Sequence, residues 1–271
     1  MPATPNLTKV RPQPQAPNAA GRHKLLLVLI VVLAASAPHN RLRADDAPAA
    51  PRRHAQLFVV LIGGMNSDPT PGQISGTALK NEGNSGMYQL CRELQHAPWC
   101  TAEYFNWNGT RAGEIARPNS PGAAGIAAAI AAHIQAQPND RTAIVGNSWG
   151  GHTAVETARE LLHRDAPLAL DRLVLIDASS TGRVGGPINT LPVNVNQTVN
   201  YFTHNVFVWG RNLGGRTIEH VDLGDPQAGF RQSGGPAYDA AFDFAAHVSA
   251  EWDTRIHADV KRRLAAILHP E

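Results

Sequence analysis

The stretch TAIVGNSWGGHTAVETARELL, residues 142–162, determines the expected fold. It begins with a short apolar run, turns through Gly146-Asn147-Ser148-Trp149-Gly150, and continues with helical spacing of apolar residues to Leu162. A continuous apolar run of this length is typical of a strand buried in a parallel sheet. A strand that leads directly into an amphipathic helix predicts a repeating unit of an α/β fold.

The same alternation continues on both sides of this stretch. The expected strands cover residues 56–62, 101–107, 142–145 and 173–176, with shorter pieces at 198–202, 207–209 and 217–223. The expected helices cover residues 85–95, the segment around Ile126, Ile130 and Ile134, residues 149–162, and a terminal helix starting at Asp253 or Thr254. Right-handed crossovers between such strands predict a doubly wound, mostly parallel sheet with helices on both faces, which is a three-layer αβα architecture.

Composition supports one folded domain behind a separate leader. The 271 residues are 43% hydrophobic and 17% charged, which is enough apolar material for a core. We expect residues 55–271 to form a single α/β domain, because no internal repeat or second core is evident. Residues 1–54 are expected to be a signal peptide followed by a disordered linker rich in Pro and Ala.

The leader has the features of an export signal. Arg22, His23 and Lys24 precede an unbroken apolar run from Leu25 to Ala35. This run is about half of the ~20 residues that a membrane-spanning helix needs, and it matches the length of a signal-peptide core. The sequence predicts an exported protein, periplasmic or extracellular, without a stable membrane span. An uncleaved leader that tethers the protein to a membrane is the alternative.

Charge is distributed unevenly along the chain. The first 54 residues carry eight Lys or Arg against two acids, whereas the remainder carries 16 against 20. The basic overall pI of about 8.7 therefore comes from the leader. A nucleic-acid-binding domain needs its positive charge on the folded surface, so binding to nucleic acid is not expected.

The two cysteines, Cys91 and Cys100, are nine positions apart and flank Pro98. In an oxidising compartment such a pair is expected to form a disulfide, which would stabilise the fold by roughly 2–3 kcal/mol. Two free buried thiols are the alternative.

The turn Gly146–Gly150 matches the pattern Gly-x-Ser-x-Gly between a strand and a helix. In this context the glycines permit a sharp turn that raises the Ser148 hydroxyl above the sheet edge. The free N–H groups of the following helix would stabilise an oxyanion beside it. Ser148 is therefore the predicted nucleophile. A glycine-rich packing turn in which Ser148 only caps the helix is the alternative.

A serine nucleophile needs a base that is oriented by an acid. Asp177 follows the strand 173–176 and is the predicted acid, with Asp222 and Asp225 as competitors. His247 is the predicted base, because it is expected in a loop shortly before the terminal helix. Three other histidines fit structural roles better: His152 on the helix after Ser148, His220 in a strand piece, and His257 in the terminal helix.

These residues resemble the α/β-hydrolase superfamily, in its compact lipase and esterase branch. The resemblance covers residues 55–268 and is specific at the turn Gly146–Gly150. The chain order Ser148, Asp177, His247 follows the order of the superfamily triad. The position of Asp177 resembles the arrangement in pancreatic-type lipases, whereas most members carry the acid one strand later. The resemblance also implies a minimal sheet and an oxyanion hole formed by the backbone N–H groups of Trp149 and of Met65, with Gly64 as the alternative to Met65.

The expected function is hydrolysis of carboxylic esters through an acyl-enzyme intermediate, as in a serine carboxylesterase or lipase. A small-molecule or lipid ester is the expected substrate, and Trp107, Trp149 and Trp209 are candidates for lining an acyl pocket. No cofactor or metal is expected. A solvated turn explains Glu219, Asp222 and Asp225 better than a calcium site does. An inactive binding protein with a hydrolase fold and a cell-envelope acyltransferase are the alternatives.

Overall fold

The computed structural model describes residues 56–65, 85–112, 114, 120–179, 190–206, 208, 213–215, 217–231 and 233–269. Contacts divide the chain into two units, Met1–Pro51 and Arg52–Glu271, and every described residue belongs to the second. The predicted signal and the linker lie outside the described residues, as does Trp209. Within the described ranges, no helix has the length and apolar character needed to cross a membrane.

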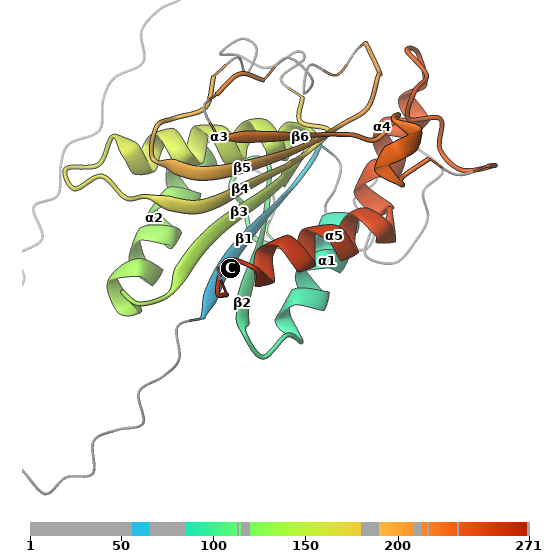
Figure 1. Cartoon of the computed structure of the whole chain (residues 1–271). Helices are drawn as coiled ribbons and strands as arrows, with labels where there is room; N and C mark the ends of the chain where they lie inside the picture. Colours follow the sequence, from blue (N-terminus) through green and yellow to red (C-terminus); the bar gives the residue numbers. More distant parts are fainter. Residues whose placement is uncertain are drawn as a thin grey trace, which may run out of the picture. The chain divides into compact units, whose positions relative to one another are not determined.

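Six parallel strands form one sheet in the order β2-β1-β3-β4-β5-β6 (Figure 1). They are β1 (Leu57–Gly63), β2 (Cys100–Asn106), β3 (Arg141–Asn147), β4 (Leu170–Ile176), β5 (Val195–Phe202) and β6 (Ile218–Asp222). The predicted doubly wound parallel sheet is confirmed. In the predicted piece 207–209 only Val208 is described, and it lies outside any strand.

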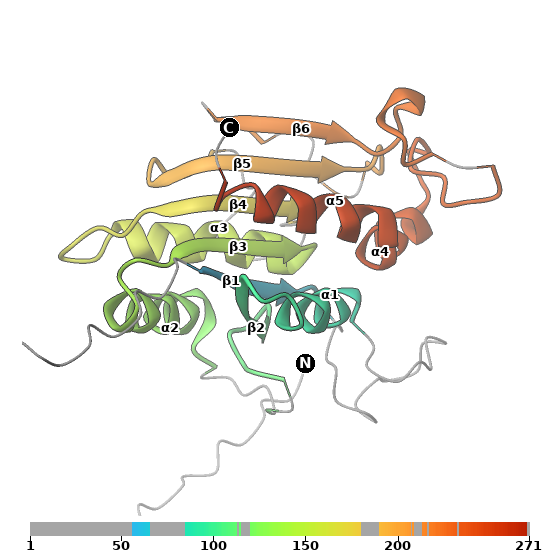
Figure 2. The same cartoon turned by 60° about the horizontal axis from the view of Figure 1, so that its bottom comes forward.

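Helices cover both faces of the sheet, which gives three layers (Figure 2). One layer contains α1 (Gly86–Gln95), α4 (Phe244–Trp252) and α5 (Thr254–Ala265), and the other contains α2 (Gly122–Ala136) and α3 (Trp149–Leu162). Side chains of β1 alternate between the two faces of the sheet and pack in both cores. Leu57, Val59 and Leu61 lie in the core with α1 and α5. Phe58, Val60 and Ile62 lie in the core with α2 and α3. Burial on both faces explains why this strand is apolar at every position.

The predicted disulfide is wrong. Cys91 on α1 and Cys100 at the start of β2 are free thiols buried in the same apolar cluster. Burial raises the pKa of each thiol to about 12, so both stay protonated near neutral pH. They fill space as small apolar side chains do.

The prediction that His247 lies in a loop is also wrong. His247 lies within the nine-residue helix α4, whose N-cap Asp243 accepts a hydrogen bond from the backbone N–H of Ala245. A small residue or a polar group occupies most positions of this helix, so its sequence lacks the apolar stripe that identified the terminal helix.

All strands run the same way, so the residues that follow them share one edge of the sheet. Gly64 follows β1, Ser148 follows β3, Asp177 follows β4 and Thr203 follows β5. The carboxyl edge therefore brings together polar groups that are far apart in sequence.

Candidate active site

Ser148 occupies a strained turn between β3 and α3. Its backbone has φ 51° and ψ −123°, and among the described residues only Ser148 and Asp177 (φ 45°) combine positive φ with a side chain. Such conformations cost of order 1–3 kcal/mol and persist where the surrounding structure enforces them. Gly150 is part of that enforcement, because a Cβ atom there would lie 2.2 Å from the carbonyl oxygen of Ile62 in β1.

Ser148, His247 and Asp177 form a continuous chain of hydrogen bonds. The Ser148 hydroxyl lies 2.9 Å from His247 Nε2, and His247 Nδ1 lies 2.7 Å from Asp177 Oδ2. Asp177 is fully buried and His247 is 7% exposed. With Nδ1–H donating to the carboxylate, the Nε2 lone pair accepts the serine proton, which is the arrangement that general-base activation of a hydroxyl requires.

Thr203 holds the carboxylate of Asp177 from the end of β5. Its backbone N–H donates to Oδ1 and its hydroxyl donates to Oδ2, each over 2.9 Å. The backbone N–H of Asp177 donates to the carbonyl of Tyr201 at 2.7 Å. Thr203 is not among the residues predicted from the sequence, although its polar side chain directly follows an expected strand.

The competing acids make other contacts. Asp222 lies 2.8 Å and 2.9 Å through its two oxygens from His204 Nε2. Asp225 accepts a hydrogen bond from the backbone N–H of Gln227, at the start of a short 3-10 helix. The geometry therefore joins His247 to Asp177.

The remaining candidate histidines also have structural contacts. His220 lies in β6 with Nδ1 3.3 Å from Asn200 Nδ2, and His257 Nε2 lies 2.8 Å from the carbonyl oxygen of Glu251. His152 is 4% exposed and lies 3.8 Å from Glu156, so it packs locally and does not face outward.

The turn after β1 passes directly beside the candidate nucleophile. A Cβ atom on Gly64 would lie 2.9 Å from Ser148 Cβ. The next residue, Met65, was predicted to supply one oxyanion N–H, and Trp149, in the first turn of α3, was predicted to supply the other. Both predicted donors therefore belong to segments that contact or adjoin Ser148.

Apolar side chains lie near the triad. Trp107 and Trp149 pack edge to face with ring centroids 5.0 Å apart. Phe244 packs against the imidazole of His247 with centroids 5.3 Å apart, yet it is 59% exposed. These aromatic side chains therefore provide apolar surface beside His247 and at the start of α3.

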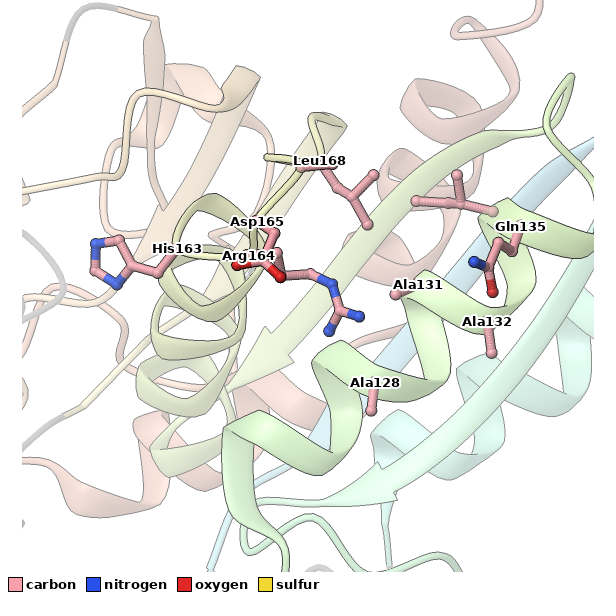
Figure 3. A pocket seen from close by; sticks show the side chains of 10 residues that line it. Ala128, Ala131, Ala132, Gln135, His163, Arg164, Asp165 and Leu168 are labelled. Atoms are coloured by element: carbon pink, nitrogen blue, oxygen red, sulfur yellow. The ribbon is translucent and has the colours of Figure 1, made fainter.

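A separate hollow of about 590 Å³ lies between the C-terminal parts of α2 and α3 (Figure 3). Alanines of α2 and the residues His163, Arg164 and Asp165 after α3 line it. Helix α3 begins at the carboxyl edge and ends near the start of β4, so this hollow lies at the opposite end of α3 from Ser148. It is not part of the triad site.

No group of three or more His, Cys, Asp or Glu side chains in the described ranges could hold a metal ion. Glu219, considered above for calcium, forms an ion pair with Arg263 through both carboxylate oxygens. That contact lowers the pKa of Glu219 despite the opposing effect of partial burial.

In its parallel sheet covered by helices on both faces and in the turn at Ser148, the chain resembles α/β hydrolases in fold. No model of a protein family matches the chain, and neither does any curated protein. Among solved structures, a putative alpha/beta hydrolase of unknown function from Agrobacterium tumefaciens matches with 17% identity and a TM-score of 0.44, covering 82% of this chain and 91% of that one.

A cutinase-like protein from Cryptococcus sp. matches with 15% identity and a TM-score of 0.39, covering 79% of this chain and 95% of that one. An acetyl xylan esterase matches with 16% identity and a TM-score of 0.36, covering 78% and 99%. All of these TM-scores are below 0.5.

Proposed function

We propose that the chain is an exported serine hydrolase that cleaves carboxylic esters, of the carboxylesterase or lipase type. Ser148 attacks the ester carbonyl carbon while its proton passes to His247 Nε2. Asp177 holds the imidazole and stabilises the imidazolium that forms. The backbone N–H groups of Met65 and Trp149 stabilise the negative oxygen of the tetrahedral intermediate.

The intermediate then loses its alkoxide, which takes the proton from His247 Nε2 and leaves as an alcohol. Ser148 now carries the acyl group as an ester. His247 removes a proton from water, and the hydroxide attacks the acyl carbon. Collapse of the second intermediate releases the carboxylic acid and restores the Ser148 hydroxyl with the proton held by His247.

One observation carries this proposal, the hydrogen-bonded series from Ser148 through His247 to Asp177. A capping serine would not need an imidazole at 2.9 Å or a fully buried carboxylate behind that imidazole. A buried carboxylate is costly unless it is paired, and here its partners are His247 and Thr203. Export is proposed from residues 1–54 alone, and the mass of the mature chain tests it.

Ser148→Ala tests the catalytic assignment. The variant should lose turnover of a p-nitrophenyl ester by about 10⁴-fold or more while it keeps the unfolding midpoint of the wild type. A fluorophosphonate probe should label the wild type at Ser148 and leave the variant unlabelled. Full activity of the variant would contradict the proposal, and absence of labelling in the wild type would indicate an inactive binding protein.

Product analysis separates hydrolysis from acyl transfer. With alcohol acceptors present at millimolar concentration, the free carboxylic acid should remain the main product. Dominant formation of a new ester would assign the same triad to an acyltransferase instead.

A further inference from the structure

The candidate base lies on a short helix, which packs on the core through Ala246 and Ala250 and makes polar contacts at both of its ends. Helix α4 has nine residues, which is too short to be stable by itself. Its orientation, and with it the place of the His247 imidazole, must come from tertiary contacts. The contacts at its C-terminal end are made by a buried carboxylate.

Glu251 lies one helical turn after His247 and is 7% exposed. Its Oε1 accepts a hydrogen bond from the Ser85 hydroxyl at 2.9 Å and another from the backbone N–H of Met87 at 3.2 Å. Both donors are completely buried at the N-terminus of α1. A carboxylate is favoured there, because the first N–H groups of a helix have no partner within the helix and carry partial positive charge.

Capping of α1 does not by itself explain why a carboxylate is buried at position 251. Ser85 already caps this helix, since its hydroxyl oxygen accepts a hydrogen bond from the backbone N–H of Tyr88 at 3.1 Å. What the carboxylate adds is a bond between α1 and α4. It connects the helix that carries the base to a helix packed firmly on the sheet.

The backbone of α4 is also close to α1 at this point. A Cβ atom on Gly86 would lie 2.1 Å from the carbonyl oxygen of Glu251, so the two helices are in direct contact there. The same carbonyl accepts a hydrogen bond from His257 Nε2 on α5 at 2.8 Å. Side chain and backbone of Glu251 thus join three helices.

The N-terminal end of α4 is connected to the acid. Asn205 Nδ2 donates to the carbonyl of Asp243, the N-cap of α4, at 3.0 Å. The backbone N–H of Asn205 donates to the Thr203 hydroxyl at 3.3 Å, and that hydroxyl donates to Asp177. One end of α4 is therefore connected to Asp177, and the carboxylate of Glu251 adds a side-chain bond at the other end, where Ala250 and the Glu251 backbone already pack against the core and α1.

We propose that Glu251 is a positioning residue for the base: by bonding α4 to the N-terminus of α1, it holds the His247 imidazole between Asp177 and Ser148. This inference rests on the proposed function, in which His247 is the general base. Loss of the Glu251 carboxylate lets α4 pivot about the end held by Asn205. Displacements of about 1 Å at a catalytic group can cost about 100-fold in rate.

The test compares Glu251→Ala, Glu251→Gln and Ser85→Ala with the control Asn194→Ala. Asn194 makes a similar structural contact far from α4, since its Nδ2 donates to the carbonyls of Ala158 and Leu168. Each variant is assayed well below its unfolding temperature for the rate of fluorophosphonate labelling of Ser148 and for kcat and KM on a p-nitrophenyl ester. The downfield proton resonance of the His247 Nδ1–H is recorded by NMR and assigned by its loss in Asp177→Asn.

We expect Glu251→Ala to reduce the labelling rate and kcat by about 10-fold to 100-fold, with KM changed less than twofold, and to weaken the downfield resonance. Glu251→Gln, which keeps an oxygen acceptor, should restore most of the rate. Asn194→Ala should lower the unfolding temperature but leave the rate and the resonance unchanged. If Glu251→Ala does not fold, Ser85→Ala decides the matter, with an expected reduction of several-fold.

The proposal is overturned if folded Glu251→Ala, or Ser85→Ala in its place, labels at the wild-type rate with the resonance intact. It is also overturned if Asn194→Ala loses rate to the same extent, because the effect would then be general destabilisation. These outcomes differ from failure of the proposed function, in which the wild type itself is neither labelled nor active.

Discussion

The two sides of the candidate triad are held in different ways. Ser148 lies in a turn formed by its sequence neighbours, β3, two glycines and the first turn of α3, and the adjacent strands β1 and β4 pack tightly against this turn. The helix that carries His247 is held by contacts with α1, α5 and the segment after β5, and one of these contacts joins Ser85 and Glu251, which are 166 positions apart. The nucleophile side stores backbone strain, whereas the base side depends on buried polar contacts between helices.

This difference determines how each side should respond to mutation. A strained turn tolerates no added atom, so changes on the nucleophile side should remove the site altogether. A short helix held at two ends can shift gradually, so changes on the base side should lower the rate in steps. The predictions below test this contrast.

The largest effect is expected for Gly150→Ala. The new Cβ atom would lie 2.2 Å from the carbonyl oxygen of Ile62, so either β1 or the turn must move. We expect at least a 100-fold loss of esterase activity and a lower free energy of unfolding, by about 1–3 kcal/mol. Steady-state kinetics and urea unfolding measure both quantities.

Gly229→Ala is the matched control for that variant. Gly229 has φ 80° with open space around its Cβ position, so an alanine there adds backbone strain without a clash. It should destabilise the protein by about 1 kcal/mol and leave activity unchanged. Equal activity losses in the two variants would remove the argument that the turn itself is intolerant.

Thr203→Val should have an intermediate effect. It preserves the shape of the side chain and the backbone N–H bond to Asp177 Oδ1, but it removes the hydroxyl that donates to Oδ2. A hydrogen bond to a charged group contributes about 1.5–3 kcal/mol, so we expect kcat to fall about 10-fold or more with little change in KM. Thr203→Ser should retain near wild-type kcat, and a kcat unaffected by the valine would show that the backbone contact is sufficient.

Gly86→Ala is expected to have a smaller effect on kcat and two opposing effects on stability. Alanine favours helix α1 by roughly 0.5–1 kcal/mol over glycine, yet its Cβ would lie 2.1 Å from the carbonyl oxygen of Glu251. We expect α4 to shift and kcat to fall about 3-fold to 10-fold. The measurement is kcat together with the unfolding midpoint, and unchanged kcat would argue that α4 does not set the position of His247.

The same contrast explains which parts of the site the sequence could predict. Gly146–Gly150 identifies Ser148 because the glycines that permit the turn are adjacent to it in sequence, although β1 packs against the same turn. Asp177 was predictable from topology, since parallel strands end at one edge. His247 was predicted as the base because a loop was expected there, but it lies in α4. The contacts of Glu251 and Asn205 that hold this helix leave no pattern in the local sequence.

Tertiary packing also determines whether the two cysteines pair and which residue supports Asp177. Cys91 and Cys100 are close in sequence, but whether two thiols pair depends on the packing of α1 on β2. Little in the sequence distinguishes Thr203 from the other threonines. Only the pairing of neighbouring strands places it beside Asp177. Such roles depend on tertiary packing that spacing alone does not contain.

The smallest predicted effect concerns the pH dependence of stability on the base side. Burial lowers the pKa of His257, against the bond to Glu251 and the nearby carboxylates of Glu93 and Asp253, which raise it. The unfolded chain therefore takes up a proton as the pH falls through about 6.5, and the folded chain takes it up only at a lower pH. The free energy of unfolding should thus decrease below pH 6.5, by at most about 1.4 kcal/mol per pH unit.

His257→Gln should reduce this slope, because the amide keeps a donor for the Glu251 carbonyl but does not titrate. Urea unfolding at pH 7.5, 6.5 and 5.5 measures the slope in both proteins. The carboxylates with lowered pKa, such as Asp259, lose their contribution at lower pH and so do not dominate this window. An identical slope in the variant would show that the contact between α5 and α4 does not respond to pH, and the base side would then depend on Glu251 and Asn205 alone.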